Sequence, residues 1–296
     1  MNIIPKTRVQ CVNRQRALLA ESPVWDIGGQ CLYWIDIEGR TFNCFNPVTS
    51  DNTSVATTER ISAFAIREKG GFVVATENGF KLYNLETNIF SHIIDPEKDK
   101  PNNRFNDGRC DRMGRFWAGT MVEHGAILPD AGLYCLDQRF ICKKKYSNVI
   151  LSNGLAWSPD NQTMYLADTR QSIVWAFDFD IDTGNISNQR SFIEFGPRDG
   201  VPDGATVDTD GCYWLAMSRA SQICRYTSSG KLDSTINLPV TKPTMCAFGG
   251  KTLNTLYVTT NSYGFSRTEL ISQPLAGSLF AIELSAQGIA ESKFLG

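Results

Sequence analysis

The chain has 296 residues, which is enough for one large β-rich domain or for two smaller domains. Hydrophobic residues make up 42% of it, and 24 glycines accompany 17 Phe, 9 Tyr and 6 Trp, a composition typical of a folded protein with many short strands and turns. The 29 basic and 31 acidic residues give a net charge of −2, so no strongly basic surface is available for nucleic acid or for an acidic membrane.

Targeting and redox features are sparse. The start of the chain, MNIIPKTRVQ, lacks the apolar core of a signal peptide, and no segment approaches the roughly 18 apolar residues of a membrane-spanning helix. The nine cysteines are odd in number and include no C-x-x-C pair, which argues against a disulfide scaffold and against a zinc knuckle. We therefore expect a cytoplasmic protein with reduced thiols, present as a monomer or a weak homo-oligomer, with no membrane or nucleic-acid partner.

Six similar β-rich segments follow one another along the chain. They are CLYWID (31–36), GFVVAT (71–76), RFWAGT (115–120), MYLAD (164–168), CYWLAM (212–217) and TLYVTT (255–260). Their equivalent positions, spaced 40 to 49 residues apart, are Tyr33, Val73, Trp117, Tyr165, Trp214 and Tyr257. A β-rich period in the forties without helical patterning predicts an all-β, six-bladed β-propeller with four-stranded antiparallel blades. We expect one domain over residues 1–296, its ring closed by TRVQCVN (7–13) pairing with the last blade near SKFLG (292–296).

Residues upstream of these segments should converge on the propeller axis. In a propeller the first strand of each blade lines the central channel. Eleven to thirteen residues before the six equivalent positions stand Glu21, Ile61, Asn106, Asn153, Asp203 and Thr244. Four of these side chains are carboxylates or amides, which rarely face inward unless they are paired or bind a metal. Together they form an oxygen-rich set that suits a hard divalent cation.

Two structural readings compete with this interpretation. Asp203 lies in GVPDGAT (200–206), and Pro-Asp-Gly is a common turn sequence. The polar residues would then cap strand ends in a hydrated channel. Because the same residue types recur at nearly the same offset in four repeats, we favour a functional role for the set. Trp25, Trp117, Trp157 and Trp214 also recur at repeat-related positions, and we expect them to pack the blades.

Five segments resemble the gluconolactonase and regucalcin family, also called the senescence marker protein family. They are AESPVWD (20–26), NNRFNDGRCD (102–111), FWAGTM (116–121), LSNGLAWSPD (151–160) and VPDGATVD (201–208), and they occur in the family's order over nearly the whole chain. Known members are six-bladed propellers that hydrolyse sugar-acid lactones with one divalent metal in the channel.

The resemblance implies a role for each of six residues. Glu21, Asn153 and Asp203 would bind the metal, which remains open among Ca, Zn, Mg, Mn and Fe, and Asp203 would also be the catalytic base. Arg104 and Asn106 would bind the substrate, and Glu123 would add an acidic contact to sugar hydroxyls. Arg104 also has a structural alternative, an ion pair with Asp107. The substrate would be a sugar lactone, of the gluconate, arabinonate, xylonate, galactonate or sulfonated type.

Other catalytic designs lack their parts in this sequence. There is no G-x-S-x-G motif, and the only two histidines, His92 and His124, lie away from the inner-strand positions, so a Ser-His-Asp triad is not expected. No P-loop or G-x-G-x-x-G fingerprint occurs. Two alternatives stay open: a regucalcin-like calcium-binding or regulatory propeller, and a propeller esterase or phosphotriesterase. DFDIDTGN (178–185) lacks the glycine and glutamate of an EF-hand loop, and we expect a turn after the third strand of its blade.

Overall fold

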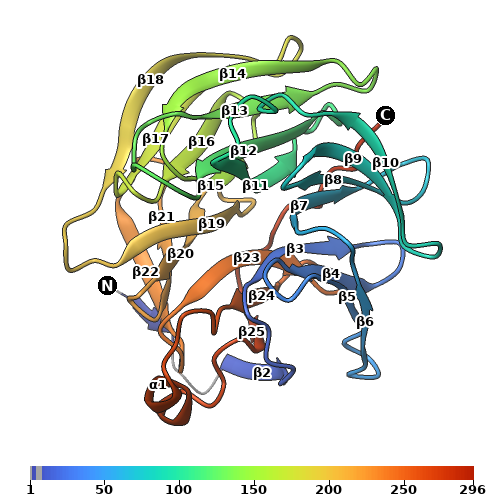
Figure 1. The fold of residues 1–296 in the computed structure, drawn as a ribbon. Coiled ribbons are helices and arrows are strands. Elements are labelled where there is room, and N and C mark those ends of the chain that lie inside the picture. The colour runs from blue at the N-terminus through green and yellow to red at the C-terminus, as the bar shows by residue number, and fades with distance from the viewer. Residues whose placement is uncertain (1, 5–8) are drawn as a thin grey trace.

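The six predicted repeats are six β-sheets arranged around a central axis, as a computed structural model shows for residues 2–4 and 9–296 (Figure 1). In the first five blades four antiparallel strands follow each other in chain order from the channel outward. The prediction of a six-bladed propeller with four-stranded antiparallel blades is confirmed. All six equivalent positions lie on the second strand of a blade, and all six residues chosen upstream of them lie on the first.

The strands have the following bounds. Blade 1 contains β3 (Ala20–Asp26), β4 (Cys31–Asp36), β5 (Thr41–Phe45) and β6 (Asn52–Ala56); blade 2 contains β7 (Ile61–Ile66), β8 (Phe72–Thr76), β9 (Gly79–Asn84) and β10 (Ile89–Ile94). Blade 3 contains β11 (Asn103–Cys110), β12 (Phe116–Val122), β13 (Ala131–Leu136) and β14 (Cys142–Val149); blade 4 contains β15 (Ser152–Trp157), β16 (Thr163–Asp168), β17 (Ile173–Asp180) and β18 (Asn185–Glu194). Blade 5 contains β19 (Val201–Val207), β20 (Tyr213–Ser218), β21 (Gln222–Tyr226) and β22 (Leu232–Asn237), with β1 (Asn2–Ile4) added in parallel to β22.

The sixth blade closes the ring. It combines β23 (Pro243–Gly249), β24 (Thr255–Thr260) and β25 (Leu279–Glu283) with β2 (Val9–Asn13) from the start of the chain as its outermost strand. The N-terminal segment therefore joins the last blade as predicted, although Thr7 and Arg8 of that segment lie outside the described residues. The predicted partner was wrong, because β2 pairs with β25 and not with residues 292–296.

The last residues of the described chain have a different role. Phe294 is completely buried between blades 2 and 3 and forms an isolated parallel bridge with Arg67. Its backbone N–H donates to Ile66 O at 2.8 Å. Because Phe294 fills the gap between blades 2 and 3, the end of the chain does not pair with β25. The edge of β25 pairs with β2 instead.

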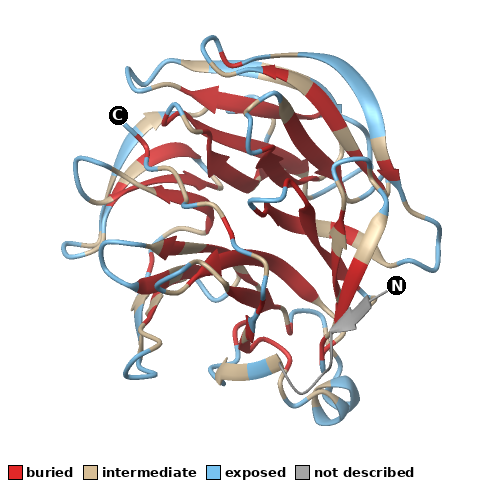
Figure 2. Ribbon diagram, turned by 180° about the vertical axis from the view of Figure 1, so that it is seen from behind, coloured by how far each residue is buried: buried red, intermediate tan, exposed pale blue. Residues whose placement is uncertain are grey.

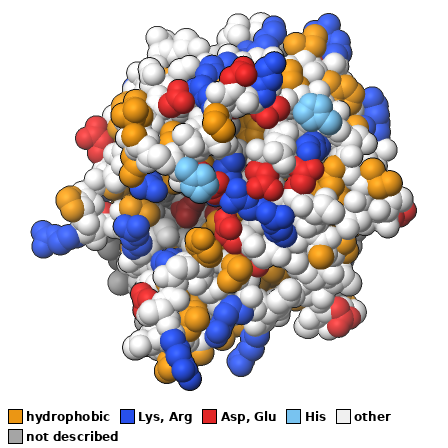
Figure 3. Space-filling view, viewed as in Figure 1, with side chains coloured by type: hydrophobic (Ala, Val, Ile, Leu, Met, Phe, Trp, Pro, Cys, Tyr) orange, Lys and Arg blue, Asp and Glu red, His pale blue; other side chains and the backbone are white. Residues whose placement is uncertain are grey.

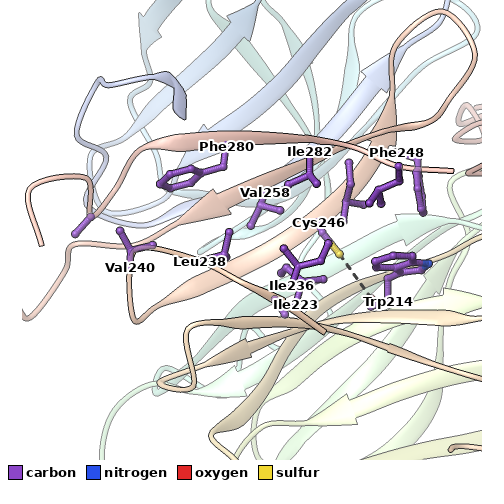
Figure 4. Close-up of a cluster of buried hydrophobic side chains, with 14 residues drawn as sticks. Trp214, Ile223, Ile236, Leu238, Val240, Cys246, Phe248, Val258, Phe280 and Ile282 are labelled. Atoms are coloured by element: carbon purple, nitrogen blue, oxygen red, sulfur yellow. Dashed lines mark hydrogen bonds between the residues drawn. The ribbon is translucent and has the colours of Figure 1, made fainter. Parts of the chain in front are cut away.

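The core lies between neighbouring blades. Buried residues gather on the inner strands, whereas the outermost strands of blades 1 to 4 are largely exposed (Figure 2). Between blades 5 and 6, Trp214 packs edge-on against Phe248 with ring centroids 5.7 Å apart, and Cys246 Sγ donates to Trp214 O (Figure 4). Trp25, Trp117, Trp157 and Trp214 are all at least 95% buried, so their predicted packing role is confirmed.

Helical structure is minimal in the described residues. The helix α1 (Arg267–Ser272) lies between β24 and β25 and begins with a capping box formed by Ser266 and Glu269. No helix among residues 2–4 and 9–296 is long and apolar enough to cross a membrane. The segment after Asp180 is a turn that follows the third strand of blade 4, as predicted from DFDIDTGN.

Candidate active site in the central channel

Each of the six inner strands has an irregular register where it passes the channel. In β3, Glu21 pairs with Ile35 but the next paired residue is Val24, opposite Tyr33. The register is also interrupted after Phe105, Asn153 and Pro202, where two residues stay unpaired, and after Ile61 and Pro243, where one does. Such β-bulges bend a strand locally and change the direction of its side chains.

The candidate residues occupy two neighbouring positions relative to these bulges. Glu21 and Asn153 are the last paired residues before the bulge, whereas Asn106 and Asp203 are the first unpaired residues within it. In a regular strand, adjacent residues face opposite sides of the sheet. The bulges remove that restriction, so residues from both positions meet at the channel.

Burial makes the largest contribution to the pKa shifts of the Glu21 and Asp203 carboxylates. It raises the pKa of Glu21 well above its ordinary value, and the negative charges of Asp203 and Asp107 raise the pKa further. Burial likewise raises the pKa of Asp203, again with a contribution from Asp107, while hydrogen bonds from the Gly204 backbone and the Asn153 side chain act in the opposite direction. Among the residues that the structure describes, neither carboxylate forms a salt bridge within 4.0 Å. Asp203 raises the pKa of Glu21 through its charge, whereas Arg104 lowers that pKa without forming a salt bridge to Glu21.

A chain of hydrogen bonds connects blades 3, 4 and 5 at this level. Arg104 Nη1 donates to Asn106 Oδ1 at 3.2 Å, and Asn106 Nδ2 donates to Asn153 Oδ1 at 3.1 Å and to Ser152 O at 3.0 Å. Asn153 Nδ2 donates to Thr169 Oγ1 at 2.8 Å, and Thr169 Oγ1 donates to Pro202 O at 2.7 Å. This chain connects Arg104 to the residue that precedes Asp203.

Glu123 lies between two arginines. Its Oε1 accepts from Arg104 Nε at 2.7 Å and from Arg60 Nη1 at 2.8 Å, and its Oε2 accepts from Arg60 Nη2 at 2.9 Å. Burial by itself would raise the pKa of Glu123, but the hydrogen bonds from Arg60 and Arg104 outweigh it and lower the pKa to about 2. Figure 3 shows basic and acidic side chains side by side near the middle of the face seen in Figure 1.

The ion pair considered between Arg104 and Asp107 is not formed. Arg104 is paired with Glu123, and a carboxylate oxygen of Asp107 instead accepts from the backbone N–H of Leu155 at 3.0 Å. Asp107 is 4% exposed, and burial raises its pKa. Its contact with Leu155 connects the bulge of β11 to the bulge of β15, so Asp107 contributes to the frame of the site.

Sequence reasoning did not identify Thr169 or Arg60. Thr169 comes directly after β16, and Arg60 comes directly before β7. Candidates were chosen by the inner-strand offset and by the family resemblance, and neither criterion includes Thr169 or Arg60. The sequence feature that could have identified Thr169 and Arg60 is their position immediately beside the end of a predicted strand. Of the two histidines, His92 lies on β10, and the exposed His124 follows β12 with its Nε2 3.4 Å from Glu123 Oε2.

The donor set fits a hard divalent cation. Within the described part of the chain, no group of three or more His, Cys, Asp or Glu side chains is arranged to hold a metal ion. The predicted metal-binding set is not a cluster of that type, because only Glu21 and Asp203 supply carboxylates and the third ligand is the amide oxygen of Asn153. Both carboxylates are half-buried, and two partly desolvated carboxylates without a salt-bridge partner are costly unless a cation balances them. Oxygen donors of this type are those preferred by Ca²⁺, Mg²⁺ and Mn²⁺.

Comparison with known proteins supports the resemblance seen in the sequence. Residues 19–262 match the family model described as SMP-30/gluconolactonase/LRE-like region. The chain is 37% identical to regucalcin of Oryctolagus cuniculus, over 98% of this chain and 99% of that protein. It is 35% identical to 6-deoxy-6-sulfogluconolactonase of Pseudomonas putida, over 97% and 99% of the two chains. The crystal structure of a calcium-binding protein, regucalcin, from Agrobacterium tumefaciens superposes with a TM-score of 0.94 at 24% identity, covering 99% of both chains. The chain therefore belongs to the SMP-30/gluconolactonase/LRE-like family.

Proposed function

We propose that this protein hydrolyses a sugar-acid lactone to the free sugar acid with the help of one divalent cation. The observation that carries the proposal is the pair of half-buried carboxylates, Glu21 and Asp203, without a salt-bridge partner among the described residues, beside the buried amide of Asn153. The relatives named 6-deoxy-6-sulfogluconolactonase and gluconolactonase support lactones as the substrate class. Glu21, Asn153 and Asp203 would hold the cation, for which Ca, Zn, Mg, Mn and Fe are the candidates.

The reaction places modest demands on the protein. A bound divalent cation would polarise the lactone carbonyl and lower the pKa of a coordinated water. Asp203 would accept a proton as the water oxygen forms its bond to the carbonyl carbon. The bond from that carbon to the ring oxygen then breaks, and the ring oxygen takes up the proton held by Asp203 to become a hydroxyl of the open acid. No covalent intermediate with the protein is needed.

Arg104 and Asn106 are placed to orient the substrate. Arg104 uses Nε for Glu123 and Nη1 for Asn106 and for Phe105 O, while its Nη2 makes no hydrogen bond with any described residue. A buried guanidinium with one free edge can donate to the hydroxyls of a neutral sugar lactone. Glu123 fixes the side chain of Arg104 and keeps acceptor capacity toward a sugar hydroxyl.

Two other functions fit the same architecture. Relatives named regucalcin, one described as a calcium-binding protein, support a propeller that binds calcium without catalysis. A propeller esterase or phosphotriesterase would use the same cation on another substrate. A binding module would not require the hydrogen-bonded Arg104 and Asn106 beside the carboxylates, and for this reason we favour a hydrolase.

A substrate panel separates these functions. Protein stripped with a chelator and reloaded singly with Ca²⁺, Zn²⁺, Mg²⁺, Mn²⁺ or Fe²⁺ is assayed by acid release on five lactones, those of gluconate, galactonate, xylonate, arabinonate and 6-deoxy-6-sulfogluconate. A phosphotriester and an aryl ester are tested in parallel. We expect metal-dependent turnover of at least one sugar lactone that exceeds turnover of both other esters. Calcium binding without turnover of any substrate would instead identify a binding protein, and preference for the phosphotriester would overturn the lactonase assignment.

A further inference from the structure

Thr169 connects the two sides of the candidate cation site through one hydroxyl group. It follows the last residue of β16, and its Oγ1 accepts from Asn153 Nδ2 at 2.8 Å. The same oxygen donates to Pro202 O at 2.7 Å, and Pro202 directly precedes Asp203 on β19. Thr169 therefore contacts the proposed amide ligand in blade 4 and the backbone beside the proposed carboxylate ligand in blade 5.

The proton count of the hydrogen-bonded chain permits one orientation of Asn153. Pro202 O can only accept, so the single hydroxyl proton of Thr169 is used there. The Thr169 oxygen must then accept from Asn153, and only Nδ2 of that side chain can donate. At the other end of the chain, the Arg104 guanidinium can only donate, which places Oδ1 of Asn106 toward it and Nδ2 toward Asn153. Both ends impose the same result, in which Asn153 Nδ2 faces Thr169 and Oδ1 faces Asn106.

This orientation decides whether Asn153 can bind a cation. An amide oxygen is a ligand for a hard cation, whereas an amide NH₂ group has no lone pair to offer. If Asn153 were flipped, its NH₂ group would face the NH₂ group of Asn106, and Thr169 could not satisfy Asn153 Oδ1 and Pro202 O with one proton. Replacing a residue that hydrogen-bonds to a metal ligand typically weakens metal affinity by about 10-fold to 100-fold.

We propose that Thr169 is a positioning residue that presents Asn153 Oδ1 to the divalent cation and holds the backbone next to Asp203. The inference rests on the proposed cation site and extends it to a residue that touches neither cation nor substrate. A hydroxyl group is required at this position, and the γ-methyl group is not.

The test compares three variants with the wild-type chain by Mn²⁺ titration, using the electron paramagnetic resonance signal of free Mn²⁺. Thr169→Val keeps the shape of the side chain and removes the hydroxyl, whereas Thr169→Ser keeps the hydroxyl. Thr260→Val is the matched control, because the buried Thr260 hydroxyl also donates to a backbone carbonyl, Ser278 O, but lies in blade 6. Thermal unfolding of all four proteins shows whether each remains folded.

We expect Thr169→Val to raise the Mn²⁺ dissociation constant by about 10-fold to 100-fold, in the range typical of residues that support metal ligands. Thr169→Ser should stay within about threefold of wild type, and Thr260→Val should bind Mn²⁺ as wild type does even if its Tm falls. Wild-type affinity in folded Thr169→Val, or equal losses in the Val and Ser variants, would overturn the role of the hydroxyl while leaving the cation site intact. Failure of the wild-type chain to bind any of Ca²⁺, Zn²⁺, Mg²⁺, Mn²⁺ and Fe²⁺ would instead overturn the proposed function and this inference with it.

Discussion

At the scale of single residues, the carboxylate of Glu123 is the group that fixes the position of Arg104. It accepts hydrogen bonds from Arg60 and Arg104, and Arg60 is held in turn by Glu77 at 2.7 Å and by Glu38 at 3.3 Å. The sequence suggested that Glu123 contacts sugar hydroxyls, which stays a prediction. The contacts described above add a second role, since Glu123 fixes the guanidinium group that we propose for substrate binding.

The low pKa of Glu123 predicts a specific pH dependence of stability. Its pKa in the folded protein is about 2, below the ordinary 4.5, so the folded state favours the charged form. The stabilisation is therefore complete above about pH 4.5 and is lost as the pH falls through 2. At neutral pH, Glu123→Gln should lower the free energy of unfolding by roughly 1 to 3 kcal/mol, discounted for the partial exposure of the side chain.

Chemical denaturation of wild type and Glu123→Gln between pH 7 and pH 2.5 checks this expectation. The difference in unfolding free energy should shrink steadily below pH 4.5. A difference that stays constant over the whole range would show that the carboxylate charge contributes nothing and that the loss comes from altered packing.

At the scale of elements, the bulges of the inner strands are what place the site residues. Gly154 lies in the bulge of β15 with φ of +58°, and a Cβ atom there would approach Tyr213 Oη to 2.4 Å and Asp203 O to 3.0 Å. Tyr213 donates to Gly154 O at 2.7 Å and is itself buried. Glycine is therefore needed both for its backbone conformation and because blades 4 and 5 approach each other closely.

Gly154→Ala should therefore damage both stability and the site. Gly70 is a matched control, since it also has a positive φ, +89°, but a Cβ atom would meet nothing within 4 Å. The strained backbone alone should cost Gly70→Ala about 1 to 2 kcal/mol. Gly154→Ala should cost roughly 2 kcal/mol more, because the methyl group overlaps Tyr213 and presses on the Asp203 backbone.

Urea unfolding of the two glycine variants, together with Mn²⁺ titration, measures these effects. We expect weakened Mn²⁺ binding in Gly154→Ala and unchanged binding in Gly70→Ala. Equal destabilisation by the two substitutions, with Mn²⁺ affinity preserved in both, would mean that the bulge adapts without moving the site.

At the scale of the whole molecule, the site depends on the closed ring. Glu21 comes from blade 1, Asn106 from blade 3, Asn153 from blade 4 and Asp203 from blade 5, so no single blade contains a site. The ends of the described chain reinforce the ring, with β2 completing blade 6 and Phe294 filling the gap between blades 2 and 3. We propose that residues 1–296 form one domain, because separated blades would expose the apolar faces that now pack against each other.

The sequence predicted the architecture well because the propeller repeats its signals six times. The second strands gave the period, and the tryptophans marked positions that proved to be buried. The site was harder to predict from the sequence. The offsets of Glu21 and Asp203 from the equivalent positions of their repeats differ by one residue, and in regular strands their side chains would therefore face opposite sides of the sheet. Only the bulges reconcile the two offsets, and they have no simple sequence signature. Thr169, Arg60 and the pairing of β2 with β25 depend on contacts between distant segments, which a repeat pattern does not specify.

The most direct test of the cation-dependent hydrolysis proposed for this channel compares Glu21→Gln with Asp203→Asn on the preferred lactone over a range of cation concentrations. Both variants lose a carboxylate that we assign to the cation, so both should need more metal. Only Asp203 is also assigned to accept the proton. We predict that excess cation restores much of the turnover of Glu21→Gln, while folded Asp203→Asn stays at least about 1,000-fold below wild type at every concentration, a difference of about 4 kcal/mol in the activation free energy. Near-normal turnover by Asp203→Asn at saturating cation would contradict the account.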